Sequence, residues 1–100
     1  MIRVKIKKKG SYYEKISILG HAMYDEYGKD IVCSAVSSIV TTTVNGILSL
    51  DRESITYMVS SKGMTIKVNK NDRTTQILIH NMVSLLKELR SNYQEYIEIK

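Results

Sequence analysis

The sequence predicts an α+β fold whose elements follow the order β-β-α-β-β-α-β. Three observations lead to this prediction: short segments in which apolar and polar residues alternate, turn residues between pairs of such segments, and two longer segments with a helical apolar period. Hairpins interrupted by helices favour a mostly antiparallel sheet with two helices packed on one face. The chain has 100 residues and no dividing linker, so we expect a single domain over residues 1–100.

The first hairpin is predicted at the N-terminus. Ile2, Val4 and Ile6 alternate with basic residues, which is the period of a strand with one buried face. Lys-Gly-Ser at residues 9–11 forms a turn sequence, and residues 12–19 return as the second strand. Five of the first nine residues are basic: Arg3, Lys5, Lys7, Lys8 and Lys9. We interpret them as the solvated face and turn of an edge strand, where lysine discourages edge pairing, with a nucleic-acid patch as the alternative.

The first helix is predicted over residues 30–50, where an apolar stripe lies opposite Ser, Thr and Asn. The stripe consists of Val32, Val36, Ile39, Val40, Val44 and Ile47. The β-branched run at residues 39–44 is poor helix material, so a buried strand is the competing interpretation. The separated faces and the length of the segment favour the helix.

The remaining elements follow from the same patterns. Residues 55–60 and 64–68 bracket a Ser-Lys-Gly turn and predict a second hairpin. Asn71 or Asp72 then caps a second helix. Its apolar stripe is expected to consist of Leu78, Met82, Leu85, Leu86, Leu89 and Tyr93. Residues 96–100 alternate again and are expected to end the chain as a strand.

Composition narrows the class of protein. The single cysteine, Cys33, cannot form an internal disulfide, so a disulfide-stabilised secreted domain is excluded. One cysteine also makes a structural zinc site improbable, and we expect neither metal nor other cofactor. No apolar run approaches the length of a membrane span, and residues 1–9 lack the apolar segment of a signal peptide. These features predict a cytoplasmic protein without membrane contact. The net charge of +5 permits a polyanionic partner.

Cys33 and His21 are the residues best suited to chemistry. If Asp30 is the N-cap of the first helix, Cys33 is the third helical residue, where unpaired N–H groups favour a thiolate and can hold an oxyanion. His21 follows Gly20 at the end of a predicted strand, in the segment leading to that helix. We expect a Cys–His dyad with Asp30 acting as the cap and not as a third catalytic member. His80 competes as base, and we expect it to be exposed.

The same segment carries a resemblance. Gly20-His21-Ala22, Tyr24, Tyr27-Gly28 and residues 30–37, Asp-Ile-Val-Cys-Ser-Ala-Val-Ser, resemble the signature of the bacterial ribosomal-processing cysteine proteases. The motif covers about a fifth of the chain, while length and element order resemble the family throughout. The family's catalytic pair falls on His21 and Cys33.

The resemblance implies an activity and partners. Such proteases remove a short N-terminal extension from a large-subunit ribosomal protein, cutting between an aromatic and a small residue. They tend to form homodimers and to carry a mobile loop over the cleft, which corresponds to residues 23–29 here. Met23, Tyr24, Tyr27 and Gly28 are the residues that we expect to bind substrate in this loop.

The alternative from another functional class is a non-catalytic ribosome- or RNA-binding module. Basic strand faces and tyrosines would serve such a module through phosphate contacts and stacking. For a protease, we expect nucleic-acid contact to be incidental, made through the ribosome or the basic N-terminal strand.

Overall fold

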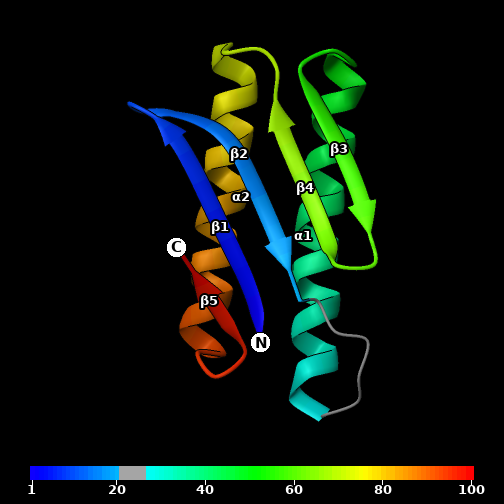
Figure 1. The fold of residues 1–100 in the computed structure, drawn as a ribbon, viewed down its shortest axis with the longest axis vertical. Coiled ribbons are helices and arrows are strands. Elements are labelled where there is room, and N and C mark those ends of the chain that lie inside the picture. Colours follow the sequence, from blue (N-terminus) through cyan, green and yellow to red (C-terminus); the bar gives the residue numbers. More distant parts are fainter. Residues whose placement is uncertain (21–26) are drawn as a thin grey trace.

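The computed structural model describes the backbone of residues 1–20 and 27–100, and the side chains of the same residues except 27–30. Seven elements follow one another in the predicted order (Figure 1). They are β1 (Ile2–Lys9), β2 (Tyr12–Leu19), α1 (Tyr27–Leu50), β3 (Ile55–Ser60), β4 (Gly63–Val68), α2 (Arg73–Asn92) and β5 (Ile97–Ile99).

The five strands form one mixed sheet in the order β3-β4-β2-β1-β5. All neighbours are antiparallel except β1 and β5, which run parallel. Both helices cover the same face of the sheet, and the other face carries no helix (Figure 1). The α+β class and the element order are thereby confirmed. The prediction that the N-terminal strand is an edge strand is wrong, because β5 pairs with its free side.

The valine stripe of α1 supplies one wall of the core. Five of its six predicted members are buried and Ile39 is half-buried. The β-branched run is therefore helical, which excludes the competing strand. Burial of this stripe against the sheet outweighs the weak intrinsic helix propensity of valine and threonine.

The second helix begins at the predicted position, but the face that it buries differs from the predicted apolar stripe. Asp72 is the N-cap, and its side chain accepts a hydrogen bond of 2.8 Å from the Thr75 backbone N–H. Ile79 and Val83 are buried together with Met82 and Leu86, whereas the predicted Leu85 is 39% exposed. The stripe is rotated because α2 packs against both the sheet and α1.

By length and composition alone, Ile31–Leu50 of α1 is apolar enough to cross a membrane, with a mean hydropathy of 1.7. This differs from the expectation that no such segment exists. The Ser and Thr residues opposite the stripe are only weakly polar, so they lower the mean hydropathy of the segment only slightly. Because its valine stripe is buried on the sheet, α1 is a core helix of this fold.

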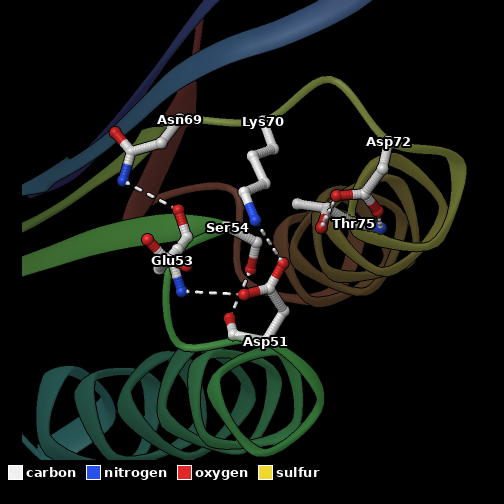
Figure 2. Close-up of polar contacts among 7 residues, drawn as sticks. All are labelled: Asp51, Glu53, Ser54, Asn69, Lys70, Asp72 and Thr75. Atoms are coloured by element: carbon white, nitrogen blue, oxygen red, sulfur yellow. Dashed lines mark hydrogen bonds and ion pairs between the residues drawn. The ribbon is translucent and has the colours of Figure 1, made fainter.

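A polar junction joins the end of α1 to the connection between β4 and α2 (Figure 2). Asp51 accepts hydrogen bonds from the Glu53 backbone N–H and from Lys70 Nζ, each at 3.0 Å. Ser54 is buried, and its hydroxyl donates to the Asp51 carbonyl at 2.8 Å. The Ser54 carbonyl in turn accepts from the backbone N–H groups of Asn69 and Lys70. These bonds tie the start of β3 and the segment after β4 to the end of α1.

Candidate active site

Cys33 lies on α1, the helix that packs against the centre of the fold. It is the seventh residue of α1, directly after the fully buried Val32. Its own side chain is half-buried and packs against the edge of the core. A thiol in this position is anchored by the helix on one side and remains partly accessible to a substrate.

The start of α1 differs from the sequence-based expectation. The helix begins at Tyr27, so Asp30 is its fourth residue and not its N-cap. The four N–H groups without an intrahelical partner belong to residues 27–30. Cys33 follows them by three to six residues, roughly 4.5–9 Å along the axis. The predicted proximity of Cys33 to the unpaired N–H groups, and with it their role as oxyanion donors, is therefore not supported.

The helix extends into the predicted loop. Tyr27, Gly28 and Lys29 of the expected loop form the first turn of α1. Gly28 therefore lies within the helix although glycine is a weak helix former. His21, Met23 and Tyr24 lie outside the described residues.

The backbone immediately before His21 is held by close contacts. Gly20 has a positive φ of 73°, and its N–H group donates to the Lys62 carbonyl at 3.1 Å. A Cβ at Gly20 would lie 2.8 Å from the Met1 carbonyl oxygen, and one at Gly63 would clash with the Ile18 carbonyl. The described backbone therefore favours glycine at position 20. Sequence analysis missed Gly63, whose only signal was its place in the predicted hairpin turn.

His80 and Cys33 lie on different helices. It is the eighth residue of α2, and α2 begins in the half of the molecule where α1 ends (Figure 1). Its Nδ1 is hydrogen-bonded to the Tyr13 hydroxyl at 2.7 Å. Burial raises the pKa of Tyr13, which keeps the hydroxyl protonated for this bond. His80 is exposed as predicted, and its contact with Tyr13 gives it a structural role.

Contacts around Tyr13 also join the hairpin of β1 and β2 to α2. The Gln76 side chain accepts from the Tyr13 N–H at 2.8 Å and donates to the Tyr13 carbonyl at 3.0 Å. The Lys8 ammonium lies 4.7 Å from the centre of the Tyr13 ring. These contacts hold His80 and Gln76 of α2 against the first hairpin.

Comparison with known proteins identifies the family of this chain. A family model described as "Cysteine protease Prp" matches residues 1–98. The ribosomal processing cysteine protease Prp of Staphylococcus aureus is 32% identical over 83 residues, which cover 80% of this chain and 78% of that protein.

Solved structures share the whole fold. A crystal structure of the S. aureus ribosomal processing protease Prp with a substrate peptide superposes with a TM-score of 0.90 at 27% identity, covering 100% of this chain and 98% of that one. A second structure of that protease, with a covalently linked product peptide, gives 0.86 at 28% identity and the same coverage. A protein of Streptococcus mutans gives 0.90 at 29% identity, covering 100% and 92%. The chain therefore belongs to the Prp family of cysteine proteases and is a peptidase.

Proposed function

We propose that this chain is a cysteine endopeptidase that removes the N-terminal extension of a large-subunit ribosomal protein, with Cys33 as nucleophile and His21 as general base and acid. One observation carries the assignment of Cys33: a cysteine protease needs a thiol nucleophile, and the chain has a single cysteine. The printed name of the S. aureus relative, a ribosomal processing protease, supports the choice of substrate.

The proposed reaction is acyl transfer in two steps. The Cys33 thiolate attacks the scissile carbonyl carbon, the C–N bond breaks, and His21 protonates the departing amine. Water then attacks the resulting thioester, and His21 accepts its proton. The new carboxyl end leaves, and the free thiol is restored. The covalently linked product in a relative's structure supports such a thioester route.

The remaining features of the proposal come from the sequence and from the family resemblance. They are cleavage between an aromatic and a small residue, substrate contacts from Met23, Tyr24, Tyr27 and Gly28, a homodimer, and a cytoplasmic location. Sedimentation equilibrium measures the oligomeric state directly. The non-catalytic module is no longer a complete account of the chain, because its family is a family of peptidases.

Substitution of Cys33 tests the proposal. A peptide spanning the junction between the extension and the mature ribosomal protein is incubated with the protein, and the products are weighed by mass spectrometry. We expect cleavage by the unsubstituted chain and none by Cys33→Ala or Cys33→Ser, since a hydroxyl is a far weaker nucleophile. Both variants should unfold at nearly the same denaturant concentration as the parent.

The neighbouring residue provides a matched control. Ser34 is exposed on the same helix, and Ser34→Ala should cleave the peptide at the parental rate. A folded Cys33→Ala protein that still cleaves would disprove the assignment of the nucleophile. Failure of the parent to cleave this peptide, with cleavage of another, would disprove the substrate.

A further inference from the structure

The sheet face without helices carries a concentration of positive charge. Buried residues alternate with exposed ones along the central strands, and the exposed ones point away from the helices. The cations on this face of β1, β2 and β4 are Arg3, Lys5, Lys7, Lys15 and Lys67. In Figure 1 this face is turned toward the reader.

Three of these lysines form a row across neighbouring strands. Lys15 lies directly opposite Lys7 on one side and Lys67 on the other. Neighbouring strands are about 4.8 Å apart, and like charges directly opposite one another destabilise a sheet. Lys7 has a compensating carboxylate, Glu14, at 3.5 Å. Within the described part of the chain, neither Lys15 nor Lys67 takes part in an ion pair.

Protection of a sheet edge does not explain the row. The strands that carry it, β1, β2 and β4, are all internal in the order β3-β4-β2-β1-β5. Lysines that discourage edge pairing belong on β3 or β5. The row therefore keeps an unfavourable arrangement of charge in the middle of an open face, where an anionic partner would compensate it.

We propose that this face, the lysine row of Lys7, Lys15 and Lys67 with its neighbours, binds the phosphate backbone of double-helical RNA. The adjacent row across the same strands presents hydroxyls, because Ser17 lies opposite Thr65. Lysine, serine and threonine are typical phosphate ligands in nucleic-acid complexes. The row also borders a shallow pocket of about 490 Å³ with Glu14, Met58 and Val68.

The composition of the face favours a helical phosphate backbone over other partners. Single-stranded RNA is held by bases stacked on aromatic rings, and the rows through Lys15 and Ser17 contain no aromatic residue. A peptide that binds by adding a strand would need a free sheet edge, and these strands are internal. The choice of RNA over DNA rests on the proposed ribosomal substrate. Cys33 belongs to a helix on the opposite face, so bound RNA leaves the thiol accessible.

Fluorescence anisotropy with a labelled RNA duplex of about 20 base pairs tests this proposal. Lys15→Gln/Lys67→Gln removes the two unpaired charges, and Lys62→Gln/Lys87→Gln removes two exposed charges elsewhere. We expect the first variant to bind at least about tenfold more weakly, and the slope of log K against log salt to become less steep by about 1.8, which corresponds to about 0.9 for each lost phosphate contact. The control variant should lose much less RNA affinity.

Two further readouts separate this proposal from the peptidase proposal. Cleavage of the free peptide should be unchanged in Lys15→Gln/Lys67→Gln, and stability should be equal or higher because the repulsion is relieved. Absence of RNA binding by the parent, or equal weakening in both variants, would overturn the RNA site whatever the peptidase result. Tighter binding to a DNA duplex, or equal competition by polyglutamate at matched charge, would overturn the assignment of RNA.

Discussion

At the scale of single residues, Gly20 sets the backbone from which His21 follows. Its positive φ costs a residue with a Cβ about 1–2 kcal/mol, and the Met1 carbonyl lies where that Cβ would be. We expect Gly20→Ala to lower the free energy of unfolding by at least that amount. It should also lower kcat/KM, because the strand end must shift. Urea unfolding and peptide cleavage measure the two effects.

Gly10 is a matched control for this substitution. Its φ is also positive, at 61°, but an added Cβ would meet no atom within 4 Å. Gly10→Ala should therefore show the backbone cost alone, with cleavage unchanged. An equal loss of cleavage in both variants would mean that Gly20 has no local role in positioning His21.

The two histidines are expected to differ in their effect on Cys33. We predict that iodoacetamide alkylates Cys33 more slowly at neutral pH in His21→Ala, because an adjacent base favours the thiolate. His80→Gln should react like the parent, since His80 is bonded to Tyr13 in another part of the fold. Mass spectrometry of quenched samples gives the rates. Identical rates in all three proteins would rule out the dyad.

Residue type and sequence context carry the assignment of the site, which stays a prediction. Cys33 was chosen because it is the only thiol, and His21 because it follows a predicted strand and precedes a predicted helix. The start of the helix was predicted three residues too late, because Gly28 and the absence of a clear period suggested a loop. Glycine is a weak helix former, so the local sequence gave no signal that the helix begins before Asp30.

At the scale of elements, α1 contains a glycine whose replacement should stabilise the helix. Gly46 is exposed within the helix, and an added Cβ would meet no atom within 4 Å. Gly46→Ala should raise the free energy of unfolding by about 0.5–1 kcal/mol, since glycine loses more backbone entropy in a helix than alanine. Urea titration followed by circular dichroism measures the change.

Gly63 gives the opposite expectation and so tests the same reasoning. A Cβ there would clash with the Ile18 carbonyl where β4 pairs with the end of β2. Gly63→Ala should destabilise the protein strongly, while Gly46→Ala stabilises it. If Gly46→Ala destabilises the protein as well, the exposed face of α1 makes a contact in solution that this monomer does not contain.

Periodicity in the sequence predicted the helices and strands better than it predicted which elements pack or pair with one another. The strands match the predicted ranges closely, because alternation is visible within a few residues. The edge position of β1 was predicted wrongly because its second neighbour, β5, is remote in the sequence. The buried face of α2 differs from the predicted stripe for a related reason. Its leucines suggested one stripe, whereas packing against α1 and the sheet selected Ile79 and Val83.

At the scale of the whole molecule, the Asp51 junction links both helices to the second hairpin and makes stability depend on pH. The Glu53 backbone N–H and the Lys70 ammonium lower the pKa of Asp51 below its ordinary value of 3.8. Asp51 in turn raises the pKa of Lys70 above 10.5. A lowered carboxyl pKa stabilises the fold above the unfolded-state value and loses this effect as the pH falls through the folded-state value. A raised ammonium pKa stabilises below its unfolded-state value and loses this effect at higher pH.

We therefore predict that Asp51→Asn is less stable than the parent near neutral pH and that the difference disappears as the pH falls below about 4. The asparagine oxygen can still accept from the Glu53 N–H, so the variant isolates the charge that faces Lys70. Lys70→Met should lose stability over the same neutral range, and the double variant should lose less than the sum of the two. Urea unfolding from acidic to neutral pH measures all four proteins. Additive losses, or a difference that persists in acid, would show that the charge pair of Asp51 and Lys70 is not the cause of the loss.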